Sequence, residues 1–298
     1  MKREIRNATV VITGASSGIG RAAARAFAAS GARLVLAARR EAALEELVTQ
    51  CERAGGQAIA ISTDVTDAAA VQQLAREASE LGDGRIDTWI NNAGVGAVGD
   101  FEQVPIETHD QVVRVNLLGY MHGAHAVLPI FKRQASGVLI NNISLGAWVP
   151  MPYAVAYSAS KFGLRGYSEA LRAELRRWPN IHVCDIFPAF IDTPGFQHGA
   201  NYTGHRLRPA PPVYAPERVA AAMVALARKP RRAVTVGASA TLARFAHFVL
   251  GDYANRVFEL AMRSYLSRAP AAPKGDGTLF DTNLDQTEPS GGWRAQVS

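Results

Sequence analysis

Tyr157 and Lys161 stand four residues apart in a segment, residues 154–178, that is expected to form a helix. Residues four apart share one face of a helix, so the phenol and the ammonium group are expected to lie together. A free phenol has a pKa of about 10, and a nearby cation lowers that pKa by favouring the phenolate. Such a pair could donate and accept a proton at a carbonyl or alcohol oxygen, which Ser144 could also hydrogen-bond.

Each of these three residues also has an ordinary structural explanation. A tyrosine near the start of an amphipathic helix usually packs against its neighbours, and a single lysine usually lies at the surface. Ser144 could simply cap a turn. Taken singly, these explanations are favoured. The catalytic interpretation is favoured when the three residues occur together with a binding site for a redox cofactor.

A glycine-rich stretch near the N-terminus predicts such a cofactor site. It lies between an expected strand at residues 9–12 and an expected helix at residues 18–29. Glycines there permit a tight turn and a close approach of the backbone to a pyrophosphate, which the N-terminus of the helix attracts. A plain glycine turn is the alternative, and the strand–turn–helix context argues against it. The residues expected to contact the cofactor are Gly14, Ser16, Ser17, Gly18, Ile19 and Gly20.

The elements that must position these residues alternate along the chain. Strands are expected at residues 9–12, 33–37, 58–61, 86–90, 138–142, 181–187 and 233–236. Helices are expected at residues 18–29, 41–54, 67–81, 107–133, 154–178 and 216–228, with Asp67 as an N-cap. This alternation predicts an α/β fold, a doubly wound Rossmann-type parallel sheet of about seven strands with helices on both faces.

The chain is expected to form one catalytic domain over residues 1–237, in which a loop at residues 192–214 could close over the site. A helical extension at residues 238–268 and an irregular tail at residues 269–298 should follow. Within the extension, Thr241–Leu266 is amphipathic, which favours packing on the domain or on another subunit. The alternative is a membrane-surface contact aided by Arg244, Arg256 and Arg263.

Composition excludes several other classes of protein. The net charge is +6, but the basic residues are scattered and are not interleaved with aromatic residues, so nucleic acid is not an expected partner. Cys51 and Cys184 form no CxxC motif, and His122 and His125 have no third ligand nearby, so neither a disulfide nor a metal is expected. Without a signal peptide or a long apolar run, a cytoplasmic location is expected.

The glycine spacing is GxxxGxG, and with the other motifs it resembles the classical short-chain dehydrogenase/reductase family. Asn91–Gly94 reads Asn-Asn-Ala-Gly after the fourth expected strand, and Tyr157 and Lys161 match Tyr-x-x-x-Lys. Ser144 stands thirteen residues before the tyrosine, as in that family (157 − 144 = 13). These motifs follow the family's order, and the resemblance spans residues 7–237.

The resemblance implies a role for each of these residues. Tyr157 would be the acid or base, Lys161 would stabilise the phenolate and hold the nicotinamide ribose, and Asn116 would hold a water that relays protons. One departure from the family is Pro188-Ala189 where many members have Pro-Gly. The further cofactor contacts that the resemblance implies are Asp64, Val65, Asn92, Ala93, Gly94, Tyr157, Lys161, Pro188, Ile191 and Thr193.

The end of the second expected strand indicates the cofactor. No Asp or Glu occurs between Gly20 and Glu41, where a carboxylate would bind the ribose hydroxyls of NAD, and the sequence instead reads Arg39-Arg40. A guanidinium group binds a 2′-phosphate through paired, charge-assisted hydrogen bonds, whereas a carboxylate would repel it. The expected cofactor is therefore NADP(H), with Arg39 in the position found in NADP-preferring members of the family. Two solvated surface arginines are the alternative.

The predicted function is an NADP(H)-dependent oxidoreductase that interconverts a lipophilic ketone or aldehyde and its alcohol. An NADP-binding sensor or scaffold without significant turnover is the alternative. The resemblance also implies a homodimer or homotetramer that forms through the helices at residues 107–133 and 154–178. Besides Ser144, the pocket lining that it implies is apolar and aromatic: Val95, Leu145, Trp148, Val149, Met151, Tyr153, Phe190, Phe196 and Tyr202.

Overall fold

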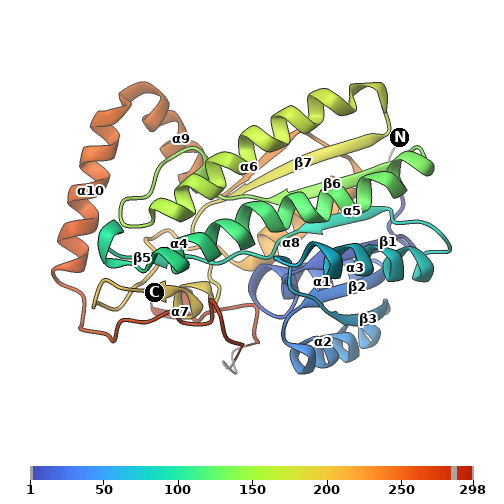
Figure 1. The fold of residues 1–298 in the computed structure, drawn as a ribbon, viewed down its shortest axis with the longest axis horizontal. Coiled ribbons are helices and arrows are strands. Elements are labelled where there is room, and N and C mark those ends of the chain that lie inside the picture. The colour runs from blue at the N-terminus through green and yellow to red at the C-terminus, as the bar shows by residue number, and fades with distance from the viewer. Residues whose placement is uncertain (1–2, 283–286, 297–298) are drawn as a thin grey trace.

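A computed structural model describes residues 3–282 and 287–296. Seven parallel strands form one sheet in the order β3-β2-β1-β4-β6-β7-β9 (Figure 1). The strands are β1 Thr9–Thr13, β2 Arg33–Ala38, β3 Gln57–Ser62, β4 Thr88–Asn91, β6 Gly137–Asn142, β7 Ile181–Pro188 and β9 Ala233–Val236. The strand order reverses between β1 and β4, and in such sheets ligands bind at the carboxyl ends of the strands beside that reversal.

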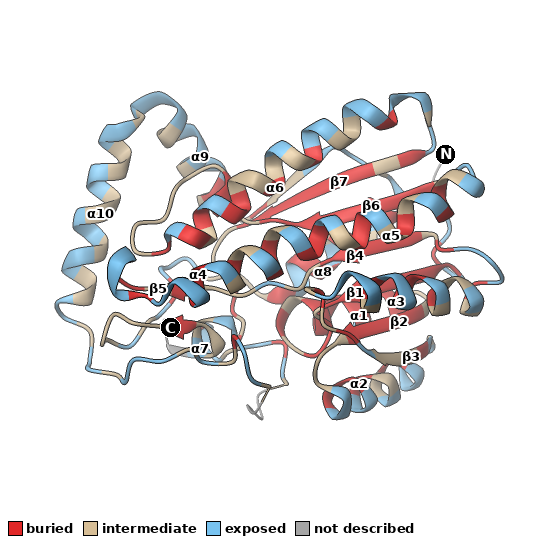
Figure 2. Cartoon of the chain, in the orientation of Figure 1, coloured by how far each residue is buried: buried red, intermediate tan, exposed pale blue. Residues whose placement is uncertain are grey.

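Helices cover both faces of the sheet, as continuous apolar strands require. The core on one face lies under α1 Gly18–Ala28, α2 Glu41–Arg53 and α8 Pro216–Arg228. The core on the other face lies under α3 Ala68–Leu81, α5 Gly119–Arg133 and α6 Val155–Glu174. The central strands are buried along most of their length (Figure 2). The predicted doubly wound α/β fold of about seven strands is therefore confirmed.

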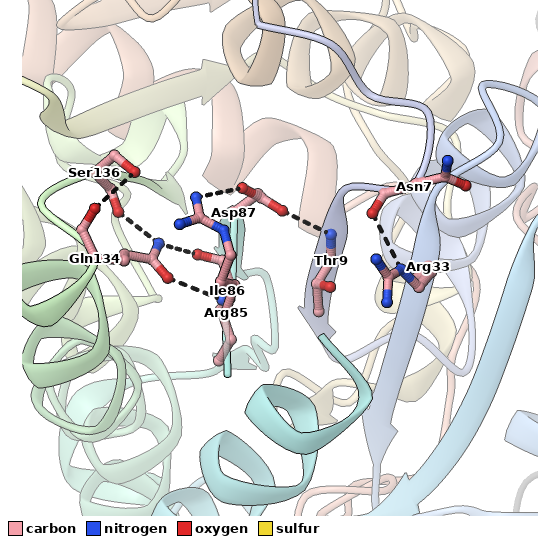
Figure 3. Close-up of polar contacts among 8 residues, drawn as sticks. All are labelled: Asn7, Thr9, Arg33, Arg85, Ile86, Asp87, Gln134 and Ser136. Carbon is pink, nitrogen blue, oxygen red and sulfur yellow. Dashed lines mark hydrogen bonds and ion pairs between the residues drawn. The ribbon is translucent and has the colours of Figure 1, made fainter. Parts of the chain in front are cut away.

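Polar contacts tie the strands together at their amino ends (Figure 3). The Asp87 carboxylate accepts a hydrogen bond from the backbone N–H of Thr9 at 3.0 Å, which joins the start of β4 to the start of β1. Arg33, at the start of β2, donates to the Asn7 carbonyl at 3.1 Å. The Gln134 side chain bonds both backbone groups of Ile86, at 3.3 and 2.6 Å. These contacts hold the amino ends of the strands together and do not involve the carboxyl ends, where ligands bind in such sheets.

The long helix expected at residues 107–133 contains a wider turn. α4 Ile106–Val113 and α5 are joined by a π-helical turn, Arg114–Leu118, which contains Asn116. Such turns are rare in helices and occur often at functional sites, because they shift one side chain out of the regular helical spacing. The predicted N-cap at Asp67 is confirmed, since its side chain accepts from the backbone N–H groups of Ala69 and Ala70.

Several elements were not expected from the sequence. β5 Ala97–Val98 and β8 Ala200–Asn201 form a separate two-stranded sheet, and a short helix α7 Gly195–His198 lies inside the predicted loop. The amphipathic extension is two helices, α9 Ala238–Leu250 and α10 Asp252–Leu266, that Gly251 separates at a φ of 51°. Among the described residues, no helix has the length and apolar character needed to cross a membrane.

Candidate active site

The residues predicted to do chemistry meet at the carboxyl edge of the sheet. The glycine turn follows β1, Asn92 follows β4, and Ser144 follows β6. Tyr157 and Lys161 reach the same edge from the first turns of α6. The edge thus brings together four chain segments that are far apart in the sequence.

Three glycines in the turn are required for three different contacts. Gly14 has a φ of 65°, and a Cβ there would lie 2.6 Å from the Cα of Ala93. Gly18 has a φ of 56°, and its Cβ would lie 3.3 Å from the side chain of Thr193. A Cβ on Gly20 would collide with the carbonyl of Gly14. The turn therefore lies close against the residues after β4 and β7, in the position where a glycine turn can hold a pyrophosphate.

Asn92 links this turn to the neighbouring strands. Its side-chain amide donates to the carbonyls of Thr13 and Gly14, both at 3.1 Å. Its side-chain oxygen accepts from the Asn142 amide at 2.9 Å. One asparagine thereby fixes the ends of β1, β4 and β6 relative to one another.

Lys161 is buried, with 3% of its surface exposed, and its Nζ lies 5.5 Å from the centroid of the Tyr157 ring. Burial lowers the pKa of Lys161 to about 7. Burial also raises the pKa of Tyr157, and a hydrogen bond with the Ser144 side chain opposes that rise. The expectation that the lysine alone would lower the tyrosine's pKa is therefore wrong here, because desolvation acts on both groups.

Ser144 has two roles in the structure. Its hydroxyl accepts from the backbone N–H of Gly146 at 3.0 Å, which caps the short turn Leu145–Ala147. The same side chain hydrogen-bonds with Tyr157. The capping explanation and the catalytic one are compatible, because the cap fixes the hydroxyl beside the phenol.

Asn116 is fully buried in the π-helical turn and is held by backbone groups. Its Oδ1 accepts from the N–H of Val95 and its Nδ2 donates to the carbonyl of Val95, both at 2.8 Å. A Cβ on Gly94 would lie 3.5 Å from Asn116 Oδ1 and 3.8 Å from Lys161 Nζ. The predicted asparagine therefore lies near the lysine and is bonded to the loop that follows β4.

Tyr120 is a site residue that the sequence reasoning missed. It is buried, its hydroxyl donates to the Asn142 carbonyl at 2.7 Å, and its ring centroid lies 5.3 Å from Lys161 Nζ. Lys161 thus contacts two aromatic rings, which attract an ammonium group that has lost its water. The signal was available, since Tyr120 stands four residues after Asn116, but it matched no motif.

The residues predicted to contact the cofactor beyond the turn also line this edge. Asp64 Oδ1 accepts from the backbone N–H and the hydroxyl of Thr66, both at 2.8 Å, so this carboxylate also supports its own turn. The Val65 carbonyl contacts His122 Nδ1 at 2.9 Å, so that histidine supports the loop after β3.

The departure at Pro188-Ala189 has a structural compensation. The backbone N–H of Ala189 donates to the Val236 carbonyl at 2.9 Å, which continues the pairing of β7 with β9. Opposite it stands Gly237, where a Cβ would lie 2.9 Å from the Ala189 Cβ. The extra methyl group at residue 189 is therefore accommodated by the absence of one at residue 237, and the backbone path there is kept.

Known proteins resemble the chain over most of this architecture. Residues 8–201 match the family model for short chain dehydrogenase. An uncharacterized oxidoreductase, YxnA, of Bacillus subtilis (strain 168) is 33% identical over 285 residues, which are 94% of this chain and 79% of that protein.

The chain belongs to the short-chain dehydrogenase family.

Solved structures of this family share the fold. A short chain dehydrogenase/reductase from Burkholderia phymatum in complex with NAD has a TM-score of 0.74 at 26% identity, covering 92% of this chain and 99% of its own. An alcohol dehydrogenase from the archaeon Thermococcus sibiricus, complexed with 5-hydroxy-NADP, has a TM-score of 0.68 at 26% identity, covering 78% and 96%. The cofactors of these relatives are thus of both kinds.

The guanidinium groups near the glycine turn of this dehydrogenase form a cluster. Arg40 Nη2 donates to the Ser16 hydroxyl at 3.2 Å. Burial lowers the pKa of Arg40, and the neighbouring positive charges of Arg21 and Arg39 lower it further. Buried Arg21 is paired with Glu46 at 2.7 Å. Arg40, which the sequence left as either a helper or a surface charge, therefore lies directly on the turn.

A C-terminal segment, described at residues 276–282 and 287–296, contacts the glycine turn and the end of β2. Arg39 donates to the backbone carbonyls of Thr278, Leu279 and Phe280, at 2.8, 3.1 and 3.3 Å. The backbone N–H of Gly18 donates to the Glu288 carbonyl at 3.1 Å. The sequence assigned no role to this tail, and nothing in its composition indicated these contacts.

The aromatic residues predicted to line the substrate pocket separate into two groups. Phe190 and Phe196 lie with ring centroids 6.2 Å apart, and Trp293 of the C-terminal segment lies 6.4 Å from Phe196. Trp148 instead packs edge-on against Phe187 at 5.4 Å. The sequence missed Trp293 because it lies about a hundred residues along the chain from its partner.

We predict that Lys161→Met raises the melting temperature of the protein in a pH-dependent way. Because burial disfavours the ammonium form, folding costs free energy wherever the unfolded lysine is protonated. That cost is complete below the folded-state pKa of about 7 and is lost as the pH rises to the ordinary value of 10.5. Thermal unfolding of the variant and of the wild type, at a pH below 7 and at a pH near 10.5, measures the difference in melting temperature.

Exposed Lys229, changed to Met, is the control and should show no such dependence. An equal shift in melting temperature for Lys161→Met at both pH values would contradict the assignment of a buried, pKa-lowered lysine.

Proposed function

We propose that this protein is an NADP(H)-dependent oxidoreductase that interconverts a lipophilic ketone or aldehyde and the corresponding alcohol. The observation that carries the proposal is the placement of the Tyr157 phenol between Ser144 and Lys161, at the sheet edge that also holds the glycine turn. A binding protein without turnover has no need of a tyrosine so placed.

The side chains divide the proton chemistry between them. A bound nicotinamide nucleotide supplies the hydride for reduction and accepts it in oxidation. The Tyr157 hydroxyl donates a proton to the carbonyl oxygen, or accepts one from the alcohol. Ser144 hydrogen-bonds the same oxygen, and the Lys161 ammonium group stabilises the phenolate that forms when Tyr157 gives up its proton. Because Lys161 is buried, its electrostatic contact with the phenolate is stronger than it would be in water.

Residue chemistry supports NADP(H) over NAD(H). The stretch from Gly20 to Glu41 holds no carboxylate, and Arg39 and Arg40 stand at the end of β2. A 2′-phosphate placed there would meet two guanidinium groups, with the charge of Arg21 behind them. The chain's cofactor preference is inferred from these residues, because the solved relatives carry NAD in one case and an NADP form in another.

The character of the aromatic residues supports a lipophilic substrate. Phe190 and Phe196 of the loop after β7 and Trp293 of the C-terminal segment form one aromatic cluster. Apolar pockets with few polar groups are typical of small-molecule sites, and here Ser144 and Tyr157 supply the polar groups. We also propose a homodimer or homotetramer, because Met121 on α5 and Val155 on α6 are among the large apolar side chains exposed on those helices.

We expect Tyr157→Phe to lower kcat for carbonyl reduction by about 10²- to 10⁴-fold, the usual contribution of a positioned general acid. NADPH should bind with unchanged Kd, because the phenyl ring keeps the packing and only the proton donor is lost. Steady-state kinetics with the best ketone or aldehyde of a lipophilic panel, and fluorescence titration with NADPH, measure the two effects.

Tyr167→Phe, ten residues farther along α6, is the matched control and should keep wild-type kcat. Near-normal turnover by Tyr157→Phe would refute the proposed acid. NADPH binding without turnover of any panel member by the wild-type protein would favour a cofactor-binding sensor instead.

We expect replacement of both Arg39 and Arg40 by Ala to reduce the preference for NADPH over NADH about tenfold or more, the value of charge-assisted hydrogen bonds to a phosphate. The ratio of the two Kd values is the quantity to measure, because any change that affects both cofactors equally cancels in it. Exposed Arg25 on α1, changed to Ala, is the control. Tighter binding of NADH than NADPH by the wild-type protein would overturn the cofactor assignment.

A further inference from the structure

Helices α9 and α10 form a hairpin that extends from one end of the domain (Figure 1) and is largely exposed (Figure 2). Phe248 is 86% exposed, more than any other large apolar residue of the described chain. Contiguous exposed apolar surface of this kind marks a site of interaction with a partner or a membrane. The large apolar residues exposed on the hairpin are Leu242, Phe245, Phe248, Val249, Leu250, Tyr253, Val257 and Leu260.

The residues around this apolar surface carry an excess of positive charge. α10 carries Arg256 and Arg263, and Arg268 follows its end, all exposed, against the two acids Asp252 and Glu259. Glu259 is already paired with Arg263 at 2.7 Å. Exposed arginines of the loop at residues 206–208 add to the excess, because the Tyr265 hydroxyl donates to the Arg206 carbonyl at 2.9 Å and so holds that loop against α10.

This charge decides between a second copy of the chain and a lipid surface. In a two-fold symmetric contact the face meets a copy of itself, so two surfaces of the same net positive charge would come together, with too few carboxylates to pair the arginines. Anionic lipid headgroups satisfy the arginines, and the acyl boundary accepts the apolar side chains. We propose that the α9–α10 hairpin binds the surface of a membrane that contains anionic lipids, without crossing it.

The base of the hairpin touches the substrate side of the site. The guanidinium carbon of Arg244 lies 3.6 Å from the ring centroid of Trp148, and the Tyr153 hydroxyl donates to Glu259 at 3.5 Å. A hairpin on the bilayer would therefore place this end of the site near lipid, from which a lipophilic substrate could enter. Only this consequence rests on the proposed function, and the membrane contact itself does not.

Vesicle co-sedimentation of the full chain tests the proposal. We expect binding to vesicles of phosphatidylcholine mixed with phosphatidylglycerol, weaker binding to phosphatidylcholine alone, and loss of binding as salt rises. The double variant Phe248→Ser/Val249→Ser should bind at least tenfold more weakly, since both side chains are exposed and contribute by burial in lipid. Ile106→Ser on α4, which is 61% exposed, is the control and should bind like wild type.

Two results would overturn the proposal. The first is wild-type protein that stays in the supernatant with every vesicle. The second is equal vesicle binding by the double variant and the wild type. If the hairpin is instead a contact between copies, wild type will not sediment with vesicles, and size-exclusion chromatography will show a larger assembly that the double variant loses.

A second inference rests on the contacts of the C-terminal segment. Asp192 anchors it by accepting from the Ser290 hydroxyl and from the backbone N–H of Trp293, both at 2.8 Å. The Trp293 indole donates to the Thr193 carbonyl at 3.0 Å. The segment is thus bound to the loop after β7, and it supplies carbonyls to two donors, the Gly18 N–H in the glycine turn and the Arg39 guanidinium group at the end of β2.

This inference rests on the proposed function, in which Arg39 binds the 2′-phosphate and the glycine turn that contains Gly18 holds the pyrophosphate. A donor that holds a carbonyl must release it before it can hold a phosphate oxygen. We infer that the C-terminal segment competes with the nucleotide. The apparent affinity for the nucleotide is lowered because only molecules with the segment undocked can bind it.

Two glycines allow this to be tested in the full chain. A Cβ on Gly291 would lie 2.5 Å from the Thr193 carbonyl oxygen, so Gly291→Ala should release the anchored end. Gly275, just before the segment, has no neighbour within 4 Å of its would-be Cβ, so Gly275→Ala is the matched control. We expect NADPH to bind Gly291→Ala roughly threefold more tightly or better, and Gly275→Ala as it binds wild type.

Unchanged or weaker NADPH binding by Gly291→Ala, with a wild-type melting curve, would overturn the inference. Weaker binding would show in addition that the segment closes over bound nucleotide. A chain shortened after Gly275 gives a second measurement with the same expected direction. Absence of NADPH binding in every variant and in wild type would instead refute the proposed cofactor.

Discussion

Lys161 is buried beside the rings of Tyr120 and Tyr157, and the rest of the site is arranged around its ammonium group. Burial of a cation without a paired carboxylate is costly, and that cost appears as a pKa lowered to about 7. The two aromatic faces offset part of the cost. A group so placed changes its charge near neutral pH and can therefore respond to the charge of a phenolate beside it.

The fold supplies this site from segments that approach one edge of a parallel sheet. Asn92 joins the turn after β1 to the ends of β4 and β6. The distance between the proposed cofactor site and Ser144, which follows β6, is therefore fixed. The π-helical turn rotates Asn116 toward the loop after β4, where two backbone bonds lock it. The strands and the buried amides of Asn92 and Asn116 thus fix the positions of the site residues. The proposed proton transfer is left to Tyr157, with Lys161 beside it.

The architecture and the meeting of the candidate site residues at one edge of the sheet could be predicted because the patterns that indicate them are local in the sequence. Strand–helix alternation, the glycine turn and the Tyr157–Lys161 spacing each occur within a few consecutive residues, and the structure brings them together at one edge. The break at Gly251 could not be predicted from the amphipathic pattern, because the apolar spacing continues across it.

Features that depend on distant residues could not be predicted. The pairing of Ala189 with Gly237 and the docking of Trp293 on the loop after β7 join residues whose relation exists only in the folded chain. The pKa of Tyr157 was misjudged for a related reason, since the spacing of Lys161 reveals a neighbouring charge but not how much water burial removes from it. Sequence patterns record proximity along an element, and desolvation is a property of the whole site.

Transfer of deuterium from the reduced cofactor to a carbonyl tests the central claim most directly. Purified protein would be incubated with NADPH deuterated at the transferred position and with lipophilic ketones and aldehydes, and the products examined by mass spectrometry. The account predicts an alcohol that carries one deuterium on its carbinol carbon, formed by the wild-type protein and not by Tyr157→Phe. Binding of the labelled NADPH with no deuterated alcohol from any substrate would contradict it.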